Sequence, residues 1–211
     1  MRHFSLIDKI LAQVDNAFTT IFTASTDARD NPANHIAEIP LTPAEQRNSV
    51  GCMRVNHTGE VCAQALYRGQ LIFCRTQKTR AMLEKSCNEE TNHLAWTKVR
   101  VQELGGRTSV LNLFFYGNSF LIGALAGMIG DQWSLGFVEE TEIQVAKHLD
   151  GHLHRLSEKD QKSRAIVTKM RDEEKNHEKA AAAAGAIELP LAAKKLMQCH
   201  SAVMTRLVYY L

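Results

Sequence analysis

The sequence EETNH at residues 89–93 returns 84 positions later as EEKNH at residues 173–177. Each copy lies in a stretch whose composition and periodicity predict a helix. Positions i and i+3 lie on one face of a helix, so each copy sets a glutamate, Glu90 or Glu174, beside the histidine three residues on. A carboxylate and an imidazole side by side are half of a metal's ligand set. The repeat therefore predicts a two-metal site shared between two helices.

Four-helix bundles that hold two iron or manganese ions take one Glu-x-x-His from each of two helices and a lone glutamate from each of the other two. The chain supplies both lone glutamates upstream of the repeats. Glu60 lies 30 residues before Glu90, and Glu142 lies 32 residues before Glu174. The two halves therefore match in content and spacing. The candidate ligands are Glu60, Glu90, His93, Glu142, Glu174 and His177.

Three more acids compete for these positions. Glu89 and Glu173 lie four residues before the histidines and face nearly the same way as the glutamates that follow them. Glu139 shares a helical face with Glu142, so either could reach a metal. Spacing alone does not decide between them. Their simpler roles are surface ion pairs or support of the histidine N–H groups, and the simplest alternative for the whole pattern is two charged, solvated helix faces.

Composition limits the other functions. The chain of 211 residues has a formal net charge of +2 with dispersed basic residues, which argues against nucleic-acid binding. Its five cysteines are odd in number and form no Cys-x-x-Cys, so neither a disulfide framework nor a zinc knuckle is expected, and a reducing compartment fits best. No dinucleotide-binding or nucleotide-binding glycine motif is present. Electrons for redox chemistry must come from a reductase, loosely bound reduced nicotinamide or the substrate itself.

Every segment of the chain reads as helical, and no alternating strand pattern stands out. Residues 1–22 predict a retained amphipathic helix, and the polar connector that follows extends to residue 41, so the bundle domain should span residues 42–211. Thr42, Pro43 and Glu45 form a capping box at its start, while Asp131 and Ser157 are expected to open two later helices. The predicted helices of this domain cover about residues 43–75, 78–104, 110–129, 132–153, 157–184 and 190–210.

The stretch Val110–Ile129 is the most apolar part of the chain. It nearly has the length of a membrane span, but Asn112, Tyr116, Asn118 and Ser119 interrupt it. One interpretation is a helix in the membrane interface. The other is a buried crossover between the second and third bundle helices. Composition favours the two equally.

Four glutamates and two histidines form a hard, oxygen-rich ligand set that favours iron or manganese, with iron preferred. Such a pair can activate dioxygen beside a dry cavity. His57 and His148 are the nearest other histidines, and Arg54, Tyr67, Trp96 and Trp133 are candidate cavity residues or plain core. A ferroxidase or a manganese catalase would share the ligands without an apolar surface, and Tyr67 is a weak candidate for a radical-bearing tyrosine.

Several motifs resemble the di-iron demethoxyubiquinone hydroxylases of ubiquinone biosynthesis, in particular the bacterial form. They are RVNHTGE at residues 54–60, the two Glu-x-x-His pairs, and Gly130-Asp131 followed by WSLG at residues 133–136. The resemblance covers about residues 40–211 and implies a ferritin-like bundle with additional N-terminal, crossover and C-terminal helices. It selects Glu142 over Glu139 and keeps His148 beside the metals. The iron ligands that it implies are Glu60, Glu90, His93, Glu142, Glu174 and His177.

The resemblance also implies an activity. A polyprenylated methoxy-benzoquinol would be hydroxylated on its ring with dioxygen, two iron ions per chain and an external two-electron donor such as NADH. Because the isoprenoid tail stays in the bilayer, we expect a peripheral protein on the cytoplasmic side of the inner membrane, docked through Val110–Ile129 with the N-terminal helix as a second contact. Other enzymes of ubiquinone biosynthesis are the implied protein partners.

Overall fold

A computed structural model describes residues 15–21 and 30–211, and these residues form helices, turns and loops without a strand. Residues 15–21 are helical, as predicted, whereas the rest of the predicted N-terminal helix and residues 23–29 of the connector lie outside the described residues. The expected all-α architecture is confirmed. The remaining helices are α2 (Pro43–Phe73), α3 (Gln77–Glu103), α4 (Asn112–Ile129), α5 (Asp131–Arg155), α6 (Gln161–Ala184) and α7 (Leu191–Val208).

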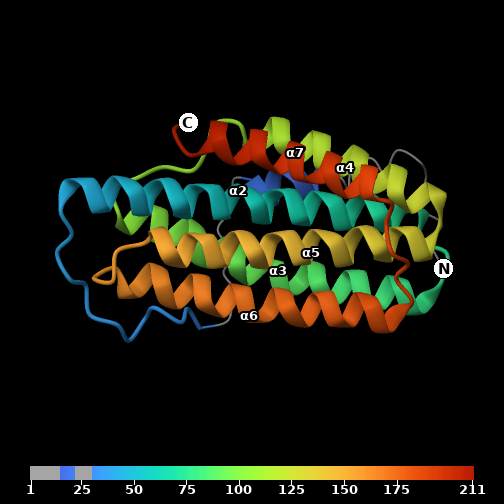
Figure 1. The fold of residues 1–211 in the computed structure, drawn as a ribbon, viewed down its shortest axis with the longest axis horizontal. Coiled ribbons are helices and arrows are strands. Elements are labelled where there is room, and N and C mark those ends of the chain that lie inside the picture. The colour runs from blue at the N-terminus through green and yellow to red at the C-terminus, as the bar shows by residue number, and fades with distance from the viewer. Residues whose placement is uncertain (1–14, 22–29) are drawn as a thin grey trace.

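Four long helices form the bundle, and two shorter ones lie outside it. Helix α2 packs against α3 and α5, and α6 packs against the same two helices, so α2 and α6 occupy opposite corners. Helices α4 and α7 lie together along the α2 side (Figure 1). The bundle can therefore place side chains from four helices in one interior, while α4 and α7 add a second layer on its α2 side.

The helix boundaries follow local signals in most places. Thr42 begins α2 with the predicted capping box, in which its hydroxyl accepts from the Glu45 N–H at 3.3 Å and the Glu45 carboxylate accepts from the Thr42 N–H at 2.8 Å. Gly105 and Gly185 follow α3 and α6 with φ of 72° and 110°, a left-handed conformation that costs glycine little. Short-range sequence chemistry therefore explains where these helices start and stop.

One predicted helix start and one predicted cap are wrong. Helix α6 begins at Gln161, not at Ser157, because Asp160 accepts the Ser163 N–H at 3.1 Å as the cap, while the Ser157 hydroxyl donates to Glu45. Asp131 does not cap α5, of which it is the first residue. Its carboxylate instead accepts the N–H groups of Arg75 and Thr76 at 2.9 and 2.8 Å and fastens the turn between α2 and α3. In both cases a tertiary contact decides which polar side chain serves the helix end.

Helix α4 has a packed face against α2 and an exposed apolar face. Gly69 of α2 and Gly123 of α4 lie where a Cβ atom would clash with the carbonyl oxygens of Phe120 and Leu66, so the two helices touch backbone to backbone. The opposite face carries large apolar side chains that are more than 60% exposed, among them Leu113 and Leu125. Within the described ranges α4 is the one helix long and apolar enough to cross a membrane, and 39% of it is buried. It is a packed crossover helix with an apolar outer face.

Candidate metal centre

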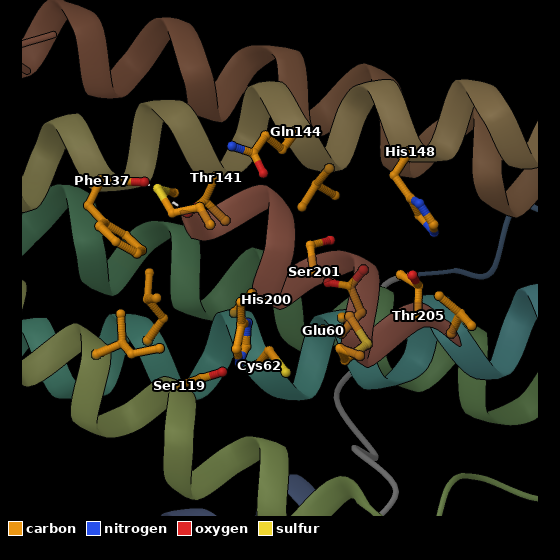
Figure 2. A pocket seen from close by; sticks show the side chains of 18 of the residues that line it. Glu60, Cys62, Ser119, Phe137, Thr141, Gln144, His148, His200, Ser201 and Thr205 are labelled. Atoms are coloured by element: carbon orange, nitrogen blue, oxygen red, sulfur yellow. Dashed lines mark hydrogen bonds between the residues drawn. The ribbon is translucent and has the colours of Figure 1, made fainter. Parts of the chain in front are cut away.

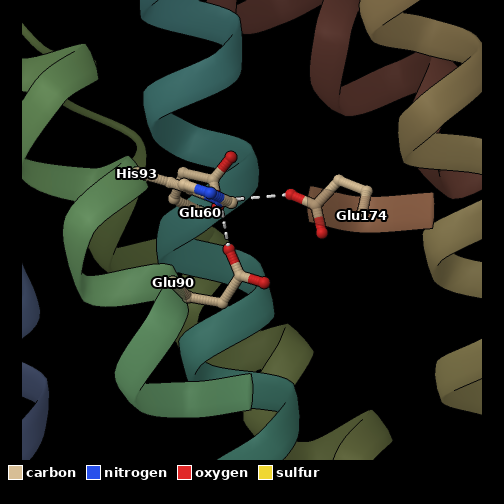
Figure 3. Close-up of side chains that lie close together, drawn as sticks. All are labelled: Glu60, Glu90, His93 and Glu174. Carbon is tan, nitrogen blue, oxygen red and sulfur yellow. Dashed lines mark hydrogen bonds and ion pairs between the residues drawn. The ribbon is translucent and has the colours of Figure 1, made fainter. Parts of the chain in front are cut away.

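The structure brings all six candidate ligands into the middle of the bundle. Two groups of side chains form there, and in each group one potential ligand atom per residue lies within 4.8 Å of all the others. All six residues are at least 95% buried. Figure 3 shows the first group, with side chains from α2, α3 and α6 converging. The first group is Glu60, Glu90, His93 and Glu174, and the second is Glu90, Glu142, Glu174 and His177.

Glu90 and Glu174 belong to both groups and face both histidines. Oε1 of Glu174 lies 3.2 Å from Nδ1 of His93, and Oε2 lies 3.0 Å from Nδ1 of His177. Glu90 repeats this arrangement in reverse, with Oε2 2.9 Å from His93 Nδ1 and Oε1 3.0 Å from His177 Nδ1. Each shared carboxylate therefore directs one oxygen to each half, which is the arrangement of a carboxylate that bridges two cations.

The cluster has more negative charge than the protein can balance. Four ionised carboxylates carry −4 and two protonated imidazoles carry +2, which leaves −2 in a buried site. Each Nδ1 atom also has at most one hydrogen, although two or more carboxylate oxygens converge on it. Burying unbalanced charge is costly. Two divalent cations would remove the excess, and oxygen-rich donors with one imidazole each suit iron or manganese. The residues present therefore fit a two-metal group.

The pKa shifts of the metal-free cluster agree with this charge excess. Burial, followed by the charge of Glu90, raises the pKa of Glu60 well above its usual value, and burial with the Glu174 and Glu90 charges does the same for Glu142. Burial opposes protonation of His177, but the carboxylates of Glu174 and Glu90, which accept hydrogen bonds from its ring, outweigh this effect and raise the pKa of His177 to about 12. Protonation of these groups would offset part of the negative charge of the cluster.

The structure decides the roles of the competing acids. Glu173 of α6 accepts from Nε2 of His93 on α3 at 2.8 Å, and Glu89 of α3 accepts from Nε2 of His177 on α6 at 2.8 Å. The first glutamate of each signature thus orients the histidine of the other signature and leaves Nδ1 for the metal side. Glu139 lies outside both groups. Sequence spacing could not show this crossed pairing because it depends on how α3 and α6 face each other.

A cavity of about 260 Å³ adjoins one end of the ligand set. Glu60 lies on its wall, and Figure 2 shows Glu60 among side chains from α2, α4, α5 and α7. Its lining is mostly apolar, with a few polar groups that include Gln144, His148, His200 and Ser201. Glu142 is not part of this wall. The hydroxyl of the fully buried Tyr67 instead donates to Glu142 Oε1.

The other predicted cavity residues have different positions. His148, which the resemblance placed beside the metals, lines the cavity outside both ligand groups, with its ring 4.1 Å from that of His152. His57 is buried and contacts the Thr97 hydroxyl. Trp96 packs on His93, whereas Trp133 is 38% exposed. Arg54 is also outside the wall, where it donates to the carbonyls of Arg107 and Tyr209.

The contribution of α7 to the site was missed. Its inner face covers the cavity, and a signal was present in the sequence, because the lining residues recur at helical spacing. What the spacing could not give was the helix against which this stripe packs. The stripe consists of Ala193, Leu196, Met197, His200, Ser201, Met204 and Thr205.

Comparisons with known proteins agree with this geometry. Residues 47–208 match the family model described as ubiquinone biosynthesis protein COQ7. A curated 3-demethoxyubiquinol 3-hydroxylase of Coxiella burnetii (strain Dugway 5J108-111) is 50% identical over 210 residues, which cover 100% of this chain and 98% of the relative. The proteins of the same name from Nitrosospira multiformis and Laribacter hongkongensis are 48% and 47% identical, and the matches cover 97% and 98% of this chain and 98% and 100% of those relatives. The chain therefore belongs to the COQ7 family of ubiquinone biosynthesis proteins.

Proposed function

We propose that this protein is an O2-dependent 3-demethoxyubiquinol 3-hydroxylase, a di-iron monooxygenase of ubiquinone biosynthesis. The observation that carries the proposal is the position of a buried two-metal ligand set beside an apolar cavity. A chain that is about half identical to curated hydroxylases of this name along its whole length supports the same substrate. The domain that does this work spans residues 42–211.

The metal ligands in this proposal come from all four bundle helices. Glu60 and His93 would help to hold one iron, Glu142 and His177 would help to hold the other, and Glu90 and Glu174, which belong to both ligand groups, would serve both. When bound, the two irons supply the two-electron reduction of dioxygen that ring hydroxylation needs. Glu89 and Glu173 keep the histidines in one tautomer and orientation.

The cavity residues bind and orient the quinol ring. The apolar walls exclude water from the Glu60 side of the centre, and the few polar groups have room to bind the ring oxygens. The overall reaction converts one ring C–H bond to C–OH, reduces the second oxygen atom to water, and consumes two electrons and two protons. The electrons come from an external two-electron donor, for which NADH is one candidate.

The outer faces of α4 and α7 form the membrane contact in this proposal. Both helices lie on the side of α2 that bears the cavity (Figure 1), and both carry large exposed apolar side chains. A quinol whose tail remains in the bilayer would then reach the cavity without entering water. The protein would bind peripherally to the cytoplasmic side of the inner membrane, with residues 1–41 as a second contact and other enzymes of ubiquinone biosynthesis as partners. The exposed residues are Leu113, Phe114, Leu121, Leu125, Met128, Ile129, Leu191, Leu196, Val203 and Leu207.

The test uses anaerobically iron-loaded protein, a short-tailed demethoxyquinol, a reductant and dioxygen. Iron content and hydroxylated product are measured for the wild type, for Glu142→Ala and for Glu139→Ala. Glu139 is the matched control because it lies one turn away on α5, outside both ligand groups. We expect about two irons per chain and product from the wild type and the control, and loss of product in Glu142→Ala. Two irons with dioxygen consumed and the quinol unchanged would instead favour a ferroxidase.

A further inference from the structure

The two halves of the centre have the same ligands, but they differ in the residue two helical turns after each lone glutamate. The residue seven positions after Glu60 is Tyr67, and the residue seven positions after Glu142 is Leu149. Seven residues are about two helical turns, so both side chains lie on the same face as the glutamate before them. Tyr67 reaches across to Glu142 and donates its hydroxyl hydrogen to Oε1. Leu149 has no hydrogen-bonding group and lines the cavity that contains Glu60.

Tyr67 is held firmly as a donor. Its side chain is fully buried and packs with Leu66, Leu83, Cys87 and Val138, which leaves its ring little freedom. The hydroxyl of this buried side chain is the donor of the hydrogen bond to Oε1 of Glu142. A fixed, protonated phenol can hold a carboxylate in one orientation.

The two lone glutamates therefore have unequal freedom. The phenol takes one of the acceptor sites on Oε1 of Glu142 and so restricts the orientation of this carboxylate. Glu60 contacts His93 and Glu90 inside the centre, with Nδ1 of His93 3.7 Å from its Oε2, and otherwise faces the cavity. A glutamate beside open space can change its mode of binding when a molecule enters that space, whereas one held by a buried hydroxyl cannot.

We propose that Tyr67 is a positioning residue that makes the two halves of the centre unequal. Its hydroxyl holds the Glu142 carboxylate in one orientation and leaves Glu60 as the carboxylate that is free to move when substrate enters the cavity. This inference rests on the proposed two-metal site. It does not depend on the identity of the quinol.

The test compares Tyr67→Phe with Tyr116→Phe in metal-free protein titrated anaerobically with Co2+, without quinol. Tyr116 is the control because its buried hydroxyl has no hydrogen-bond partner within the described chain, so its removal changes no contact. Co2+ uptake gives the affinity of each binding step, and visible absorption reports the coordination of each ion. Loss of an outer hydrogen bond to a ligand typically costs about 10–100-fold in metal affinity.

We expect the wild type and Tyr116→Phe to bind two Co2+ ions alike. Tyr67→Phe should weaken one binding step by about 10–100-fold and alter the absorption of that ion. Glu142→Ala should weaken the same step, and addition of Tyr67→Phe to it should cause no further loss. If Tyr67→Phe binds both ions with wild-type affinity and spectrum, Tyr67 is a packing residue and the inference is wrong. If the wild type itself fails to bind two ions, the proposed metal centre fails instead.

Discussion

The two halves of the metal centre share a ligand set but not their surroundings. Glu60 with His93 and Glu142 with His177 are matched by sequence, by burial and by a crossed glutamate on each histidine. Glu60 lies on the wall of the cavity, whereas Glu142 lies outside that wall and accepts a hydrogen bond from Tyr67. The comparison shows that a symmetric bundle can build a symmetric ligand set. The helices packed around the bundle then determine the side from which a substrate can approach the metals.

The source of the difference is visible in the arrangement of the helices. Helices α4 and α7 both pack on α2, and α7 completes the cavity wall opposite Glu60 (Figures 1 and 2). The α6 side has no such layer among the described helices. Helices α4 and α7 therefore make the two halves of the metal centre different, because they form a cavity beside Glu60.

The largest expected effect breaks both halves together. Glu174→Ala removes a carboxylate that faces both histidines, so we expect the iron content to fall to nearly zero and product formation to be lost. Glu142→Ala removes a ligand from one half only and should retain the metal of the Glu60 half. Iron analysis of the purified variants measures this difference. Retention of one tightly bound iron in Glu174→Ala would show that the two groups do not share this carboxylate.

The next effect tests whether the open side admits the substrate. A Cβ atom added at Gly59, on the cavity wall, would meet open space, so the side chain of Gly59→Leu should fill part of the cavity beside Glu60. We expect kcat/KM for the quinol to fall by at least about 10-fold at unchanged iron content, since the ring loses its position. Gly151→Leu is the control, because Gly151 also meets open space but lies on the exposed face of α5. Equal kcat/KM values for the two variants would exclude the cavity as the quinol site.

A smaller effect sharpens the comparison by addressing each half separately. Glu89→Gln should weaken metal binding at the His177 half, and Glu173→Gln at the His93 half, each by about 10–100-fold. Each variant should thus affect the half that contains the histidine of the other signature. Stepwise Co2+ titration distinguishes the two binding steps, with the exposed Glu84→Gln as a control. Weakening of the same step by both glutamines would contradict the crossed pairing.

These residues also show how far the sequence could lead. The repeat and its spacing proposed the six residues that meet in the structure, because ligands on one helix follow the helical period, and the family resemblance selected Glu142 over Glu139. The capping box at Thr42 and the glycines at 105 and 185 marked helix ends for the same local reason. Local chemistry was thus sufficient wherever the partner lies within a turn or two of the chain.

Contacts between helices could not be predicted in this way. The bond from Tyr67 to Glu142, the crossed roles of Glu89 and Glu173, and the position of α7 over the cavity all depend on rotation and crossing of helices. The expected cap of α5 by Asp131 was wrong for the same reason, because its carboxylate accepts from Arg75 and Thr76 instead. A period identifies a face of a helix, but packing decides what that face meets.

The smallest expected effect concerns His57, which lies one turn before Glu60. His57 is fully buried beside Thr97, and burial lowers its pKa from 6.5 to about 4. Between these pH values His57 is protonated in the unfolded chain but neutral in the folded protein. The free energy of unfolding therefore falls as the pH drops from 6.5 toward 4. At pH 5 the loss is about 2 kcal/mol, from about 1.5 pKa units at 1.36 kcal/mol each.

His57→Gln should remove this loss and leave the rest of the pH dependence in place. Urea unfolding of metal-free protein at pH 7 and pH 5 measures it, and the difference between the two values should be about 2 kcal/mol smaller in the variant than in the wild type. The exposed His154→Gln should behave like the wild type. An unchanged difference in His57→Gln would mean that His57 becomes protonated in the folded state, which would place a positive charge one turn from Glu60 and alter the half of the centre that faces the cavity.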